Sequence, residues 1–194
     1  MKKLKITFDS PAILIFTAIC FGAFLLNAVT MGWTNHALFS VYRSSLLDPL
    51  TYVRMIGHVF GHADWGHFCG NIMLLLVVGP LLEEKYGTQN ILLVMLVTAL
   101  LTGLVHYLFF PTTALLGASG VVFAMILLSG AVNLTEKEVP VTLILVALFY
   151  LGGQVYDGLF VNDNVSNLTH ILGGLTGAGM GFWMNSRKMK RMAS

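Results

Sequence analysis

Apolar residues occur along this chain in long runs that are separated by short polar stretches. A helix needs about 20 such residues to cross the roughly 30 Å hydrocarbon core of a bilayer. The second and fourth runs are short for this, so we expect those spans to begin or end inside protein rather than in lipid. The pattern predicts an all-α, polytopic membrane protein with six transmembrane helices, at residues 11–31, 67–82, 89–110, 117–133, 139–155 and 168–186.

Composition supports a membrane protein, because 56% of the 194 residues are hydrophobic and only 10% are charged, whereas soluble domains carry about 25% charged residues. We expect a single membrane domain over residues 1–194, with short tails at about 1–10 and 187–194. The apolar run that begins at Pro11 is interpreted as a retained first span rather than a signal peptide. The net charge of +2, without a basic stripe, predicts no nucleic-acid partner. Cys20 and Cys69 lie in separate apolar runs and are expected to be packing residues.

The cationic residues orient the predicted spans. Only Arg43 and Arg54 fall on one side, and the cations on the other side are Lys2, Lys3, Lys5, Lys85, Lys137, Arg187, Lys188, Lys190 and Arg191. This positive-inside bias predicts a multi-pass protein of the cell membrane with both termini in the cytoplasm (the inner membrane if the source is bacterial). The long connection at about 32–66 then lies outside, and its aromatic residues predict a position at the headgroup level.

Four polar side chains are predicted to reach one layer of the membrane. Measured from the first charged residue at the cytoplasmic end of each span, Ser119 and His170 both lie about 26 Å up at about 1.5 Å per residue, and His67 lies about 24 Å up. Asn71 is one turn lower, at about 18 Å. Polar groups at such depth usually mark function, although four unrelated residues that each bond to a neighbouring helix are the alternative interpretation.

Ser119 has glycine neighbours in the run Gly117-Ala118-Ser119-Gly120. A serine is a weak nucleophile until a base takes its proton, and a buried, neutral His170 is suited to that role. If Ser119 begins a helix, unpaired backbone N–H groups point at it, and Gly117 lets the chain turn tightly. The alternative is that Ser119 is only a helix N-cap.

The span of His170 also carries Gly173, Gly177 and Gly181, at offsets that keep them on the His170 face. Glycines at this spacing let two membrane helices pack with their backbones close together. We therefore expect this face to pack against the helix of Ser119.

His67 and Asn71 are four residues apart and share a helix face. Both are able to donate a hydrogen bond to a developing oxyanion, and an interhelical hydrogen-bonded pair is the alternative. His58 and His62 have the spacing of metal ligands on a helix, but carboxylates are scarce and no His-Glu-x-x-His is present. A structural or interfacial role is favoured for them, and neither a metal nor a cofactor is predicted.

These motifs resemble the rhomboid family of intramembrane serine proteases, in its bacterial six-span form. The resemblance covers about Arg54 to Gly181, and its motifs are 67–71 (HFCGN), 117–120 (GASG) and 170–173 (HILG). It implies that Ser119 is the nucleophile and His170 the base, without an acidic third member. It also implies that Asn71, His67 and the backbone N–H of Ser119 form an oxyanion hole, and that the substrates are transmembrane segments of other proteins.

The chain departs from the family pattern at three places. Val53 precedes Arg54 where the family often has tryptophan, and the run Glu83-Glu84-Lys85 replaces Glu-x-Arg. Phe123 stands where a tyrosine commonly stacks on the histidine, so the ring is kept and the hydroxyl is lost.

Two alternatives come from other functional classes. One is a non-catalytic rhomboid-like protein that binds membrane helices. The other is a histidine-lined carrier of a metal or another solute, for which His58 and His62 would matter more than Ser119.

Overall fold

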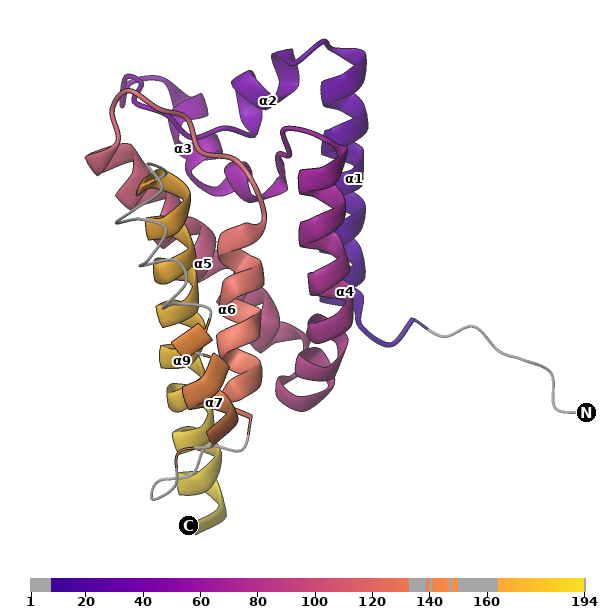
Figure 1. Cartoon of the computed structure of the whole chain (residues 1–194), viewed down its shortest axis with the longest axis vertical. Helices are drawn as coiled ribbons and strands as arrows, with labels where there is room; N and C mark the ends of the chain where they lie inside the picture. Colours follow the sequence, from indigo (N-terminus) through magenta and orange to yellow (C-terminus); the bar gives the residue numbers. More distant parts are fainter. Residues whose placement is uncertain (1–7, 133–138, 140, 147, 150–163, 194) are drawn as a thin grey trace, which may run out of the picture.

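The computed structural model describes residues 8–132, 139, 141–146, 148–149 and 164–193 (Figure 1). Within these ranges the chain is helical and contains no strand, which confirms the all-α prediction for the described residues. Its elements are α1 (Pro11–Val29), α2 (Trp33–Leu38), α3 (Pro49–Gly57), the 3₁₀ turn η1 (His58–Phe60), α4 (Trp65–Tyr86), α5 (Thr88–Phe109), α6 (Ser119–Gly130), α7 (Val141–Val146) and α9 (Asn164–Ala193).

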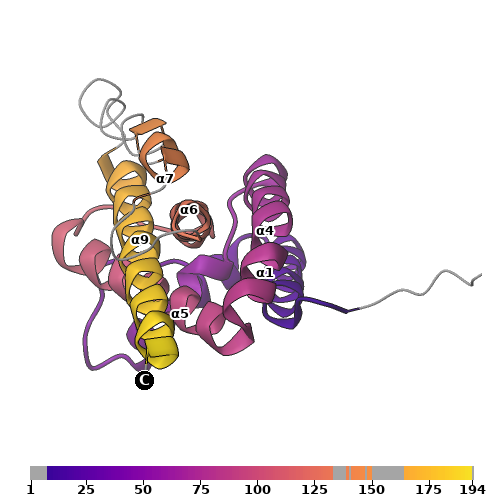
Figure 2. The same ribbon diagram turned by 90° about the horizontal axis from the view of Figure 1, so that it is seen from below.

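Helix α6 is the centre of the bundle. Seen from below, it lies between α9 on one side and α4 on the other (Figure 2). Nine of its 12 residues are buried. A central helix is surrounded by protein on all sides, so it does not need to cross the whole bilayer. At about 1.5 Å per residue, α6 is indeed too short to cross a membrane.

Three helices of the described part are long and apolar enough to span a bilayer, namely α1, α4 and α5. Their outer faces keep large apolar side chains exposed, as helices that face lipid do; examples are Leu26, Val77, Leu81 and Leu101. The expectation of a short second span was wrong, because α4 extends beyond 67–82 at both ends and has 22 residues. The expectation of a short fourth span is confirmed by α6.

The two last predicted spans have different outcomes. The fifth predicted span, at 139–155, falls largely outside the described residues. In the part of it that is described, α7 forms one short helix. The sixth region is helical, as α9, which begins before residue 168 and continues to Ala193, but α9 is not among the three described helices that are long and apolar enough to span a bilayer. The region expected to be a tail at 187–194 therefore continues α9 as far as Ala193, because no helix-breaking residue interrupts it.

A buried carboxylate joins α1 to α4. Glu83, near the end of α4, accepts hydrogen bonds from the backbone N–H groups of Ala12 (2.9 Å) and Ile13 (3.1 Å). Ser10, the N-cap of α1, provides no side-chain bond, so Glu83 satisfies N–H groups that a helix start otherwise leaves unpaired. The start of α1 and the end of α4 consequently lie at the same level of the bundle.

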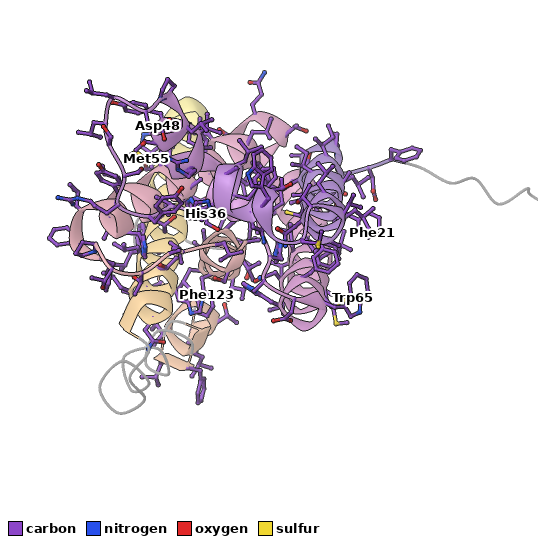
Figure 3. The ribbon with its side chains drawn as sticks, turned by 90° about the horizontal axis from the view of Figure 1, so that it is seen from above. Phe21, His36, Asp48, Met55, Trp65 and Phe123 are labelled. Atoms are coloured by element: carbon purple, nitrogen blue, oxygen red, sulfur yellow. The ribbon has the colours of Figure 1, made fainter. Side chains whose placement is uncertain are left out.

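The long first connection folds into α2, α3 and η1 and covers one end of the bundle, where Figure 3 labels His36, Asp48 and Met55. Its anchor is the buried Arg54, whose guanidinium pairs with the Asp48 carboxylate at 2.6 Å and lies 4.7 Å from the ring centroid of Tyr42. The hydrogen bond from Arg54 lowers the pKa of Asp48. Val53 at the position before Arg54 therefore does not prevent the arginine from anchoring this connection.

Candidate active site

Ser119 is the first residue of α6, and the residue that caps this helix is Ala118. The interpretation of Ser119 as the N-cap is therefore wrong, and the cap residue makes no side-chain hydrogen bond. The first intrahelical bond runs from the N–H of Val122 to the carbonyl of Ala118, at 2.9 Å. The N–H groups before it lie at the positive end of the helix, a position that favours negative charge.

Gly117 forms the turn that leads into Ser119, and it brings His67 to the same place. Its φ of +132° lies in a region that side chains other than glycine rarely adopt. A Cβ at Gly117 would lie 2.7 Å from both Cε1 and Nε2 of His67, and 3.9 Å from Oγ of Ser119. The missing side chain is therefore what leaves room for the His67 imidazole beside this turn.

The first connection holds this turn in position. The N–H of Gly117 donates to the carbonyl of His58 at 2.9 Å. Two residues earlier, Leu115 and Val41 exchange a pair of backbone hydrogen bonds, each of 2.9 Å. The backbone on the N-terminal side of Ser119 is thus fixed to a segment that is distant in sequence.

His170 reaches the first turn of α6 from α9. Its ring stacks on Phe123 with the centroids 4.4 Å apart and the planes 8° from parallel, and Phe123, labelled in Figure 3, lies one turn after Ser119. The neighbouring Thr169 places Cγ2 3.3 Å from the Cβ position of Gly120. The stack shows that Phe123 keeps the ring contact without a tyrosine hydroxyl.

The glycine ladder of α9 packs against α6 as predicted. A Cβ at Gly173 would overlap the backbone carbonyl of Gly120, and a Cβ at Gly177 would overlap that of Ala124. A Cβ at Gly181 would lie 2.7 Å from the Cβ of Ala131. The two helices are therefore in backbone contact from Gly173 to Gly177, about one turn, and remain close at Gly181, on the face of α9 that also carries His170.

Asn71 lies on α4, one turn further along the face that carries His67, and it is buried. Its Nδ2 donates to the backbone carbonyl of His67 at 3.1 Å. One of its two amide hydrogens is thus used within α4, and the second stays available as a donor. The N–H of His67 is bound to the carboxylate of Asp64, the N-cap of α4, at 2.8 Å.

The remaining histidines of the first connection have structural contacts. Nε2 of His58 lies 3.2 Å from the hydroxyl of Thr102 on α5, and the ring of His62 meets Phe68 edge-on. Burial lowers the pKa of both His58 and His62 to about 4, so both are neutral at pH 7. The described residues contain no group of three or more His, Cys, Asp or Glu side chains that could hold a metal ion.

Several supporting residues were not identified from the sequence alone. They are polar residues that interact with buried groups: Asp48 pairs with Arg54, Thr102 hydrogen-bonds with His58, and Asn185 donates to the carbonyl at the end of α6. Thr102 and Asn185 interrupt apolar runs, and an intramembrane polar residue is a signal that points to such contacts. Asp48 carried a weaker signal, as a helix N-cap before a proline.

Known proteins are similar to this chain over the helices that form the candidate site. Residues 49–187 match a family model described as the Rhomboid domain. The chain is 32% identical over 138 residues to rhomboid-related protein 1 of Caenorhabditis elegans, which covers 66% of this chain and 39% of that protein. It is 28% identical over 185 residues to rhomboid protease GlpG of Yersinia pestis, with 89% of this chain and 62% of that protein covered.

A third relative is the chloroplastic rhomboid-like protein 11 of Arabidopsis thaliana, 27% identical over 151 residues, with 70% of this chain and 53% of that protein covered. The chain thus spans between 39% and 62% of the length of these three relatives. The family match extends over more than half of the chain and includes Ser119, His170, His67 and Asn71, with all of α4 and α6 and α9 as far as residue 187. On this basis the protein belongs to the rhomboid family.

Proposed function

We propose that this protein is an intramembrane serine endopeptidase that hydrolyses peptide bonds in transmembrane segments of other membrane proteins. Ser119 is the nucleophile and His170 is the general base and acid. The observation that carries the proposal is the stack of His170 on Phe123, which brings an imidazole to the first turn of the helix that Ser119 begins. The similarity to a rhomboid protease over 89% of the chain supports the same function.

The chemistry follows the roles of these groups. His170 takes the proton from Oγ of Ser119 as the oxygen attacks the scissile carbonyl carbon, and the carbonyl oxygen becomes an oxyanion. The N–H of Ser119, the positive end of α6 and the side chains of His67 and Asn71 stabilise that charge. His170 then gives the proton to the leaving amine, which completes the acyl-enzyme. In the second stage His170 takes a proton from water, the water oxygen attacks the acyl carbon, and the bond to Oγ breaks as His170 returns the proton to Ser119.

The membrane arrangement that we propose has six spans with both termini in the cytoplasm. Ser119 then lies toward the outer surface, under the first connection, and water enters from that side. A substrate helix has to unwind locally before its carbonyls become accessible, since helical carbonyls are already hydrogen-bonded. Small or helix-breaking residues near the cleavage point are therefore favoured.

Covalent labelling with a fluorophosphonate tests the dyad without any knowledge of the substrate. We expect the wild-type protein to be labelled at Ser119, and both Ser119→Ala and His170→Ala to lose labelling while they keep their thermal stability. Ser129→Ala is a matched control on the same helix, because the Ser129 hydroxyl donates to the carbonyl of Ile126 at 2.7 Å. A folded wild-type protein that resists labelling would instead favour a non-catalytic, helix-binding member of the family.

A further inference from the structure

The end of α6 is buried in the protein and has few ways to satisfy its carbonyl groups. The helix has only 12 residues, about 18 Å at 1.5 Å per residue, so it ends within the bundle. The last carbonyls of a helix have no intrahelical partner, and a buried backbone carbonyl without a partner costs free energy. Ala131, the C-cap of α6, is completely buried.

A side chain from α9 supplies the missing partner. Nδ2 of Asn185 donates to the carbonyl oxygen of Ala131 at 2.7 Å. The same nitrogen lies 3.4 Å from the hydroxyl oxygen of Tyr86, at the end of α4. Asn185 is 7% exposed, so this amide joins three helices at the level where α6 ends.

Between the stack of His170 on Phe123 and Asn185, α9 approaches α6 most closely at glycines. Gly173 and Gly177 place bare backbone against the carbonyls of Gly120 and Ala124. Such close packing holds two helices together, but glycines have no side chains that interlock and oppose sliding. The Asn185 amide forms a directional bond, which weakens steeply when donor and acceptor are displaced.

We propose that Asn185 is a positioning residue that sets the axial register of α9 on α6 and thereby the depth of His170 relative to Ser119. This proposal rests on the function proposed above. Asn185 lies 15 residues after His170 on a continuous helix, about 22 Å away at 1.5 Å per residue. A rigid helix transmits a displacement at one end to the other, so the amide near Ala131 controls where the imidazole lies.

The test compares variants with different donors at this position. Asn185→Leu keeps the approximate volume and loses the amide, whereas Asn185→Gln keeps an NH₂ donor. Met184→Ala is the matched control, because Met184 is a buried core residue next in sequence and its truncation lowers the melting temperature by leaving a cavity, without removing the bond to Ala131. Each variant is purified and measured for thermal melting and for the rate at which a fluorophosphonate labels Ser119.

We expect Asn185→Leu to lower the labelling rate at least tenfold, since a misplacement of about 1 Å costs up to about 10²-fold. Asn185→Gln should recover most of that rate, and Met184→Ala should melt earlier with a wild-type labelling rate. A wild-type rate in Asn185→Leu, or an equal loss of rate in Met184→Ala, would overturn the positioning role.

A second measurement separates this proposal from the function itself. Spin labels on the exposed positions Leu81 of α4 and Leu175 of α9 report the distance between these helices in protein that otherwise lacks cysteines. Asn185→Leu should shift or broaden that distance, whereas Met184→Ala should not. An unchanged distance in Asn185→Leu contradicts the register proposal, whether or not the wild-type protein is labelled by the fluorophosphonate.

Discussion

The contact between Gly173 and Gly120 can be tested with a single methyl group. Gly173→Ala adds only a Cβ, which would overlap the carbonyl oxygen of Gly120 and lie 2.8 Å from its carbonyl carbon. These are backbone atoms of α6, so no flexible side chain is able to move aside. Either α9 or the first turn of α6 has to shift, and that turn begins with Ser119.

The size of the shift follows from the same distances. Carbon atoms in normal contact are at least about 3.5 Å apart, so a separation of 2.8 Å from the carbonyl carbon alone requires a movement of about 0.7 Å, and the nearer carbonyl oxygen requires more. Overpacking of this kind costs about 1–3 kcal/mol of stability. Because His170 lies one turn from Gly173, a displacement approaching 1 Å is expected to lower the reaction rate by about 10- to 100-fold.

The assay is the rate of Ser119 labelling or of substrate cleavage, together with thermal melting of the purified protein. Gly179→Ala is the control on the same helix, because no heavy atom lies within 4 Å of its Cβ position. Alanine is the better helix former, so this control should keep the wild-type rate and gain up to about 1 kcal/mol. Wild-type rate and melting temperature in Gly173→Ala would refute the backbone contact, and a loss of stability alone would refute its link to the dyad.

Three other predictions concern the surroundings of the site. Glu83→Gln should lower the melting temperature and speed hydrogen exchange at Ala12, because hydrogen bonds to a charged group contribute about 1.5–3 kcal/mol; unchanged exchange would count against the cap on α1. The free energy of unfolding of the first connection should fall as the pH is lowered from about 6.5 to 4. The reason is that the pKa of His58 is 6.5 in the unfolded chain and about 4 in the folded one, so protonation favours the unfolded state. The expected loss is up to about 3 kcal/mol, and a melting temperature that is flat over this range would contradict it. Asn71→Ala should lower kcat by up to about 10²–10³-fold, whereas a change in KM alone would make Asn71 a packing residue.

Apolar run lengths identified the helices that carry the site, and the depth estimate placed Ser119 and His170 in one layer. The stack of His170 on Phe123 agrees with that layer. The glycine spacing on α9 was enough to predict which face meets α6, because small residues at that period have a specific packing use. Boundaries were less predictable: apolar runs mark the membrane-facing part of a helix, whereas α4 also includes Trp65 and Gly66 at its start and the polar run 83–86 at its end.

The fold of the first connection could not be derived from the sequence pattern. Its helices depend on distant partners, such as the carbonyl of Ala37, to which Arg54 donates at 3.4 Å, and the backbone of Leu115, which pairs with Val41. The local spacing of apolar residues does not indicate which distant residues these partners are. Asn185 was missed for the same reason, because its role depends on where α6 ends in space.

Cleavage of a transmembrane substrate by wild type and Ser119→Ala, side by side in liposomes, tests the central claim most directly. Mass spectrometry of the products locates the cut, and melting curves show that both proteins are folded. The account predicts that the wild-type protein cuts within the transmembrane segment of the substrate, near its outer end, and that Ser119→Ala leaves the substrate intact. Cleavage by Ser119→Ala at the wild-type rate and at the same bond would contradict it.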